Sequence, residues 1–356
     1  MKYKYILTII CVILFFAIPS LGLAKTYSSF GPFTVRNQNP LYLQTLNLTP
    51  MRATVLPLHT LEFRIDSAYS NVFEKGSNST YSYMADMELW RLAFHAIYAP
   101  RDDMEVGIEI PVIQLWSGFI DPFIQKFHNF FGFPNAGREN FPNNQFHFFL
   151  NKNGQTIYSV NSQTLNLGDI TLHFKHHVLD EGRINPALAW FFDFKFPTGQ
   201  WSRGLGSGAP DFGLGVALEK SYKRLHGYLN AAYFVSARND SLEDLMNQVF
   251  FSYSASVEFT ILPSWSVLAQ INGGTPLLAH TGLDEWDGVP LDLIIGFKGE
   301  EKGLLWGNDL IWQVGFSEDA TSGGPSVDFT TFLSIGMRFD VKKHKRYKGD
   351  WLADRK

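Results

Sequence analysis

The chain is almost free of thiols, since its 356 residues include a single cysteine, Cys11. Cys11 lies within residues 1–24, where Lys2 and Lys4 precede an apolar run from Tyr5 to Leu23 that ends in a small-x-small cleavage site. This pattern predicts a secretory signal peptide, with a retained membrane anchor as the alternative. The mature chain would then contain no thiol, which excludes disulfides, cysteine nucleophiles and thiolate metal sites.

Long hydrophobic runs are also lacking. Beyond residue 24, no apolar run approaches the roughly 20 residues that a membrane-spanning helix needs. An exported chain of this kind is either soluble or a β-barrel. The composition favours the barrel, because 15% of the residues are aromatic and only 18% are charged. Lipid-facing and lumen-facing residues alternate along a barrel strand, so their hydropathies average out over the chain.

Neither sign of charge dominates, as the formal net charge is only −4. A nucleic-acid partner is excluded, because such a protein needs a basic face. Basic residues cluster only in the tail, residues 341–356, which we expect to be a solvated periplasmic extension. Contact of this tail with anionic lipid or the cell wall is the alternative.

Alternation of apolar and polar residues is the main pattern that is present. The stretch Val249 to Phe259 shows it most clearly, with aromatic or apolar residues at odd positions and Ser252, Ser254, Ser256 and Glu258 between them. Because a strand sends successive side chains to opposite faces, this stretch has one apolar and one polar face. It is the pattern of a wall with lipid on one side and a lumen on the other.

Twelve segments between residues 58 and 340 show this alternation, so we predict an all-β, antiparallel up-and-down transmembrane barrel of about twelve strands. We expect short turns at 99–103, 180–184, 222–224, 260–264 and 299–303. Long loops are expected at 71–83, 117–166, 198–209, 237–247, 274–289 and 317–327. Outer-membrane barrels have short periplasmic turns and long external loops, and this order places both barrel ends in the periplasm. A change of phase near Leu89 predicts a β-bulge there.

Residues 25–57 lack alternation and contain Gly31, Pro32, Pro40, Pro50 and Pro57. We expect an irregular segment that lies in the periplasm or folds into the lumen as a plug, because irregular backbone is tolerated at membrane depth only inside a protein-lined cavity. The candidate plug residues are Arg36, Asn37, Gln38 and Asn39.

The loop 117–166 is too long for a plain connection. The helical spacing of its phenylalanines predicts an amphipathic helix. This helix could constrict the pore, form a lid at the outer rim, or only stabilise the mouth. The candidate constriction or loop residues are Phe123, Phe127, His128, Phe131 and Arg138.

Charged residues of both signs fall on the expected lumen face, where they could brace the barrel or select solutes. The candidate lining residues are Arg64, Arg91, Glu105, Glu109, Lys175, Asp193, Lys195 and Arg338. No metal or cofactor site is expected, because His173 and His177 would lie about 13 Å apart on a strand. A lipid-modifying enzyme would need a wall serine near a histidine such as His95 or His226, and no short motif links the two.

The chain resembles the domain of unknown function 3187 family of Gram-negative outer-membrane proteins over most of its mature length. The resemblance is carried by Gly31, Pro32, Phe33, Arg36, Asn37, Gln38, Asn39 and Pro40; by Phe127, His128, Phe131, Gly132, Pro134, Asn135 and Arg138; and by Gly168, Asp169, Pro197, Thr198, Gly199, Gly206, Ser207 and Gly208. It implies an outer-membrane barrel and brings no catalytic residues with it. The Gly-Asp and Pro-Thr-Gly turns also resemble those of barrels linked to the uptake of aromatic compounds.

The sequence therefore predicts an integral outer-membrane channel or transporter for small solutes, hydrophobic ones included, that needs no cofactor and has no catalytic residues. Its expected partners are outer-membrane lipid, the barrel-assembly machinery and a small-molecule solute. A membrane-embedded lipid-modifying enzyme and a plugged structural or binding barrel are the alternatives.

Overall fold

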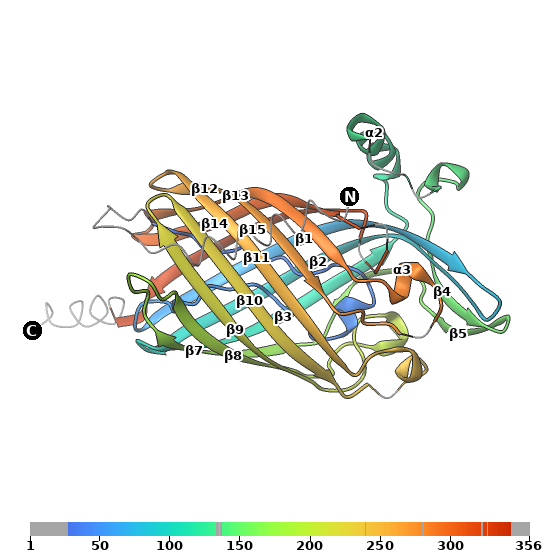
Figure 1. Cartoon of the computed structure of the whole chain (residues 1–356), viewed down its shortest axis with the longest axis horizontal. Coiled ribbons are helices and arrows are strands. Elements are labelled where there is room, and N and C mark those ends of the chain that lie inside the picture. The colour runs from blue at the N-terminus through green and yellow to red at the C-terminus, as the bar shows by residue number, and fades with distance from the viewer. Residues whose placement is uncertain are drawn as a thin grey trace, which may run out of the picture.

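The computed structural model describes residues 28–132, 135, 137–238, 240–279, 281–321, 323–325 and 327–342. The predicted signal peptide and all but the first two residues of the basic tail lie outside this part of the chain. Twelve antiparallel strands form a closed barrel (Figure 1). They are β1 (Thr60–Ser77), β2 (Tyr81–Arg101), β3 (Met104–Trp116), β7 (Thr171–Leu179), β8 (Ala187–Lys195), β9 (Asp211–Tyr222), β10 (Leu225–Ser236), β11 (Val249–Leu262), β12 (Trp265–Gly274), β13 (Leu291–Leu305), β14 (Asn308–Asp319) and β15 (Phe329–Asp340).

The barrel closes where the first strand meets the last. β1 pairs with β15 from Thr60 opposite Asp340 to Asn71 opposite Phe329. Closure leaves no free edge in the wall, which is what a sheet in lipid requires. The predicted fold class and strand number are confirmed.

Three short strands of the long loop extend the wall at one end. β4 (His147–Lys152) pairs with the outer part of β2 and with β5 (Gln155–Ser159), and β6 (Gln163–Leu167) pairs with β3. The same loop contains α2 (Asp121–Phe131), which confirms the expected helix, and η2 (Arg138–Asn140). Further short helices are η1 (Tyr42–Gln44), η3 (Trp201–Arg203), η4 (Glu243–Leu245) and α3 (Asp284–Asp287). No helix among the described residues is long and apolar enough to cross a membrane.

Short and long connections gather at opposite ends of the barrel, which we name the short-turn end and the long-loop end. Two expected connections were placed wrongly. Residues 71–83 are mostly strand, because β1 and β2 continue as a protruding hairpin joined at 78–80. The turn expected at 299–303 falls at 306–307, because β13 continues to Leu305.

The strands present an apolar band outward. Phe63, Phe94, Leu214, Leu333 and Ile335 are examples, with exposed fractions of 43% to 59%. In β11, Phe259 is exposed on this face, whereas Ser252, Ser254, Ser256 and Glu258 are buried on the inner face. The predicted orientation of this strand is therefore observed.

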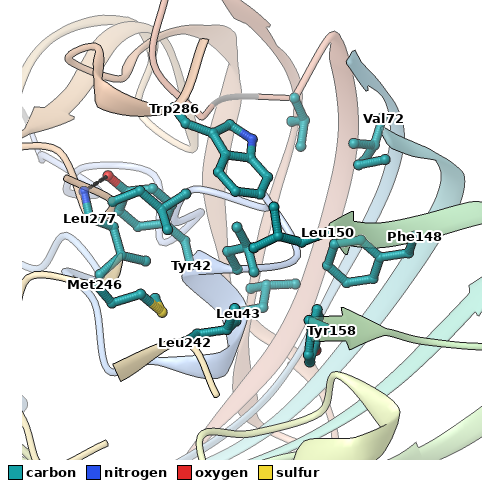
Figure 2. Close-up of a cluster of buried hydrophobic side chains, with 14 of the residues drawn as sticks. Tyr42, Leu43, Val72, Phe148, Leu150, Tyr158, Leu242, Met246, Leu277 and Trp286 are labelled. Atoms are coloured by element: carbon teal, nitrogen blue, oxygen red, sulfur yellow. Dashed lines mark hydrogen bonds between the residues drawn. The ribbon is translucent and has the colours of Figure 1, made fainter. Parts of the chain in front are cut away.

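The inner face changes character along the barrel, and this explains an incorrect prediction. The pairing of β1 with β2 runs without a register shift through Leu89, so no bulge lies there. Met87 and Leu89 instead point inward, in the same phase as Arg91, and are fully buried. They belong to a large apolar cluster that fills the long-loop end (Figure 2).

Candidate functional site: the barrel interior

Residues 28–57, here called the interior segment, contact the inner face of the barrel on many sides. In this part of the chain the only regular element is η1. Many backbone groups of the interior segment are hydrogen-bonded by side chains of the wall, and not by neighbouring strands. Examples are Phe33 N to Gln270 Oε1 at 2.8 Å and Leu46 N to Asp211 Oδ2 at 2.8 Å. Other wall residues that bond backbone groups of the segment are Glu105, Lys175, His177, Lys195, Asn230, Glu258, Asn272 and Lys298.

This arrangement solves a physical problem. Buried peptide groups without partners are costly, and an irregular segment cannot satisfy its own. The polar inner face provides those partners one by one. The interior segment is thus compatible with a lumen position without forming a strand.

The four candidate plug residues shape the turn that leads into η1. Arg36 donates to the carbonyl oxygens of Tyr42 at 3.2 Å and Thr45 at 2.7 Å. Asn37 Oδ1 accepts from the amide of Asn39, whose own side chain accepts from the amide of Leu41. Gln38 donates to the carbonyl of Arg36 at 2.7 Å. Burial lowers the pKa of Arg36 to about 10, so the guanidinium is still charged at neutral pH.

At the long-loop end, η1 is embedded in the apolar cluster. Tyr42 and Leu43 pack with side chains from loops and from β4 and β5, including Phe148, Tyr158 and Trp286 (Figure 2). The Tyr42 hydroxyl accepts a hydrogen bond from Leu277 N at 3.1 Å. The interior segment and the long loops therefore share one core, which closes this end of the barrel.

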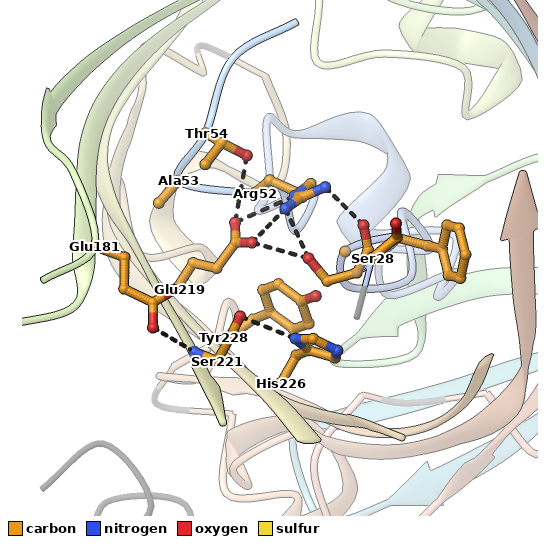
Figure 3. A network of polar contacts seen from close by, with 12 residues as sticks. Ser28, Arg52, Ala53, Thr54, Glu181, Glu219, Ser221, His226 and Tyr228 are labelled. Atoms are coloured by element: carbon orange, nitrogen blue, oxygen red, sulfur yellow. Dashed lines mark hydrogen bonds and ion pairs between the residues drawn. The ribbon is translucent and has the colours of Figure 1, made fainter. Parts of the chain in front are cut away.

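Nearer the short-turn end, a charged pair ties the segment to the wall. The Arg52 guanidinium pairs with Glu219 of β9 and donates to Ser29 Oγ at 2.8 Å (Figure 3). Thr54 also donates to Glu219, at 3.5 Å. Gly31 lies beside this pair with a φ of +90°, and a Cβ there would lie 2.5 Å from Arg52 Cγ. Only glycine fits this position, both for its backbone conformation and for its close approach.

A cavity of about 250 Å³ lies between the interior segment and the walls of β1–β3, β7 and β13–β15. Five basic side chains line it, namely Arg52, Arg64, Lys175, Lys298 and Arg338. Three acidic ones do so, namely Glu62, Glu105 and Glu300, together with His95 and His173. The cavity belongs to the short-turn half of the barrel, because Glu62, Glu105 and Arg338 lie next to strand ends there.

The eight candidate lining residues all lie on the inner face, and each has a partner of opposite charge or, for Asp193, a histidine. Arg64 bonds Glu62 at 2.9 Å and Asp66 at 2.8 Å, and Arg338 bonds Glu62 at 2.9 Å. The remaining pairs are Arg91 with Glu109, Lys175 with Glu105 at 2.7 Å, His173 with Asp193 at 2.7 Å, and Lys195 with Asp169 at 2.6 Å and Asp211 at 3.1 Å. They brace the wall, and four of them also line the cavity.

The carboxylate of Asp169 contacts both of the other glycine-containing motifs of the sequence, residues 197–199 and 206–208, and Asp169 itself belongs to the motif at 168–169. Its carboxylate accepts from Lys195 Nζ, from Gly199 N at 2.7 Å and from Ser207 N at 3.3 Å. A Cβ at Gly206 would lie 2.4 Å from this carboxylate. The Gly-Asp and Pro-Thr-Gly turns therefore lie together and fix the β8–β9 loop to the start of β7.

The helix of the long loop does not constrict the pore. Phe127 packs against Phe316 and Phe329, with ring centroids 6.5 and 5.3 Å apart. Both partners share the phase of exposed wall residues such as Val314 and Leu333, so they face outward. α2 therefore lies against the outer wall near the long-loop end, and its Phe123 is 53% exposed (Figure 1). The constriction role for Phe123, Phe127 and His128 is wrong; of Phe131 only the backbone is described, at the end of this helix.

A buried polar cluster attaches α2 to the wall. Arg138 pairs with Asp121 at 2.5 Å and with Asp328, and Asn71 of β1 donates to Asp121 at 2.8 Å. His128 is buried, with its Nε2 3.9 Å from Glu318 Oε1. Burial raises the pKa of the Asp328 carboxyl, although Arg138 opposes this shift. Arg138 is thus a structural bridge of the outer rim and not a pore residue.

His226 is not bonded to the wall serines Ser252, Ser254 and Ser256, although another serine, Ser221, lies within hydrogen-bonding distance of its ring. The two ring nitrogens of His226 lie 2.9 Å from Ser221 Oγ and 3.0 Å from Thr260 Oγ1. Ser252 donates to Asn47 at 2.8 Å. Among the described residues, no group of three or more His, Cys, Asp or Glu side chains could hold a metal ion.

Sequence reasoning overlooked Arg52, Glu219 and Tyr42. Glu219 could have been found, because it shares the inward phase of Asp211 in β9. Arg52 and Tyr42 belong to a segment without periodicity, so no pattern indicated their positions.

The closed twelve-stranded wall, its outward apolar band and its polar interior define the class of outer-membrane-type β-barrels. The chain belongs to the family of proteins of unknown function DUF3187, whose model matches residues 5–340. The resemblance found in the sequence is thereby confirmed.

Solved structures share the fold. The COG4313 outer membrane channel from Pseudomonas putida F1 is similar with a TM-score of 0.52 and 13% identity, over 82% of this chain and 100% of that one. A Pseudomonas aeruginosa FadL homologue has a TM-score of 0.36 and 8% identity, over 91% and 100%. The Ralstonia pickettii toluene transporter TbuX has a TM-score of 0.34 and 7% identity, over 92% and 98%. No curated protein matches the chain. At these identities the likeness concerns the fold alone.

Proposed function

We propose that this protein is an integral outer-membrane transport barrel for small solutes, gated by its own interior segment. The short-turn end faces the periplasm and the long-loop end faces outward, as in other outer-membrane barrels. Residues 1–24 direct export and are removed, and the barrel-assembly machinery inserts the chain. Lipid covers the outward apolar band.

The observation that carries this proposal is the way the interior segment is held. It is bonded by side chains of the wall and packed in three apolar clusters, and it contributes no strand to the sheet. Displacing it would therefore leave the backbone ladder of the wall intact. A plug that is separate from the ladder can move without unfolding the barrel. Removal of a wall strand would instead leave backbone groups of its neighbours unpaired in lipid.

Replacing Arg52 by methionine tests this proposal. The substitution leaves the buried Glu219 without its cation, and losing a hydrogen bond to a charged group in this partly exposed pair costs about 1.5–3 kcal/mol. We expect the segment to detach more often, so that planar-bilayer recordings show more frequent openings and a protease on the short-turn side cleaves the segment faster. The matched control is Arg101→Met, which breaks an exposed pair with Asp103 on a turn. Equal opening frequencies in the wild type and Arg52→Met would contradict the proposal.

The position of α2 leads to a second prediction. Since the helix packs on the outer wall, replacing residues 121–131 by a short glycine-serine linker should leave the single-channel conductance unchanged. The heat resistance of the folded barrel should fall, because the bonds of Asp121 with Asn71 and Arg138 are lost. Electrophoresis of heated and unheated samples measures the second effect. A conductance that rises would return α2 to a role in the pore.

A further inference from the structure

In three pairs around the cavity, the basic side chain or histidine is more exposed than its carboxylate partner. The side chain of Arg52 is 32% exposed and that of its partner Glu219 is 4% exposed. The corresponding fractions are 26% and 4% for Arg338 and Glu62. For His173 and Asp193 they are 22% and 2%. In these three pairs the nitrogen-bearing side chain is more exposed than the carboxylate, whereas Lys175 and Glu105 are about equally buried, at 9% and 11%.

Lys298 also lines the cavity. Its Nζ donates to the carbonyl of Pro32 at 2.6 Å, and within the described residues it forms no ion pair. One of its three donor positions is thus used by a neutral carbonyl, and none is used by a charged partner. Arg64 lines the same cavity. Basic side chains thus outnumber acidic ones in the cavity lining by five to three, although the whole chain has a net charge of −4.

Apolar side chains also line the cavity. The interior segment contributes Pro50, Met51, Val55, Leu56 and Pro57. A ligand that fits here needs an anionic group for the basic side chains and an apolar body for the apolar ones. A charged hydrogen bond in such an enclosed site is stronger than one in water, which favours an ionised group over a neutral one.

We propose that this cavity is a binding site for small carboxylates with an apolar body, the solute class that the barrel handles. The statement that the barrel transports these carboxylates rests on the proposed function. Their binding to the cavity does not require transport. The carboxylate lies against Lys298 and Arg338, and the apolar body contacts Met51 and Leu56. Small size follows from the volume of about 250 Å³.

Binding of four probes to the full mature protein in nanodiscs tests this site, with empty nanodiscs as the blank in isothermal titration calorimetry. The probes are hexanoate, its neutral analogue hexanamide, the cation hexylammonium and inorganic phosphate. We expect hexanoate to bind about tenfold more tightly than hexanamide, since a hydrogen bond to a charged group is at stake. Hexylammonium should not bind. Hexanamide binding as tightly as hexanoate would overturn the proposal, and phosphate binding as tightly as hexanoate would remove the role of the apolar side chains.

Two variants locate the binding on the protein. Lys298→Gln should weaken hexanoate binding about tenfold. Lys302→Gln, which removes an exposed lysine further along the same strand, should have no effect. Equal affinities of both variants and the wild type would overturn the site. Hexanoate binding without any conductance would refute transport and leave the cavity assignment intact. Conductance without preferential hexanoate binding would refute the cavity assignment and leave transport intact.

Discussion

Tyr42→Ala is expected to convert a mostly closed barrel into one that opens frequently. Tyr42 is 2% exposed and lies within the cluster that closes the long-loop end. Truncating a buried aromatic residue to alanine costs about 3–5 kcal/mol. If the loss falls on the closed arrangement of η1, the equilibrium shifts toward the open state by about 100-fold or more, because each 1.4 kcal/mol is about a factor of ten.

Planar-bilayer recordings measure this effect as the fraction of time spent open. Tyr42→Phe is the matched control, since it keeps the ring and removes only the hydroxyl that accepts from Leu277 N. A net hydrogen bond contributes about 1 kcal/mol, so the control should open only slightly more than the wild type. If both variants resemble the wild type while the barrel is folded, the apolar cluster does not govern opening.

Cross-linking the interior segment to the wall should have the opposite effect and abolish opening. Asn47 and Ser252 suit this purpose, because Ser252 Oγ lies 2.8 Å from Asn47 Oδ1. The double variant Asn47→Cys/Ser252→Cys can be joined by a short, reducible bis-methanethiosulfonate. The expected absence of thiols from the mature chain leaves no competing site.

The matched control joins two wall strands and leaves the segment free. Ser70 of β1 and Thr330 of β15 face each other in the ladder, with their hydroxyl oxygens 2.8 Å apart. The cross-linked double variant Ser70→Cys/Thr330→Cys should open as often as its reduced form. If this control also closes, the effect comes from stiffening the wall, and the interior segment loses its special role.

The fold could be read largely from the sequence because the strands obey one rule. Lipid on one side and a polar interior on the other impose alternation, as in Val249 to Phe259, and the turns interrupt it. The rule failed at Met87 and Leu89, which are apolar and yet point inward. At the long-loop end the interior is a packed core, so the inward face of β2 is apolar there while Asp86 and Glu88 lie on its outward face, and the pattern is inverted.

The site was less accessible to sequence reasoning. The inward charges of the wall followed from alternation, as with Glu105, Lys175 and Asp193. Their partners on the interior segment, such as Arg52, come from backbone of irregular conformation, which has no period to read. The position of α2 was also hidden, because an amphipathic helix needs one apolar surface and both the lumen and the outer wall offer one. Only the contacts of Phe127 and Arg138 decide between them.

The most direct test combines the two changes in one protein. The triple variant Tyr42→Ala/Asn47→Cys/Ser252→Cys is cross-linked, inserted into a planar bilayer and then reduced during the recording. The gating proposal predicts a silent barrel that starts to conduct when the cross-link is cut and that matches Tyr42→Ala thereafter. A cross-linked barrel that conducts like its reduced form would show that solutes pass without movement of the interior segment, and it would contradict the proposal.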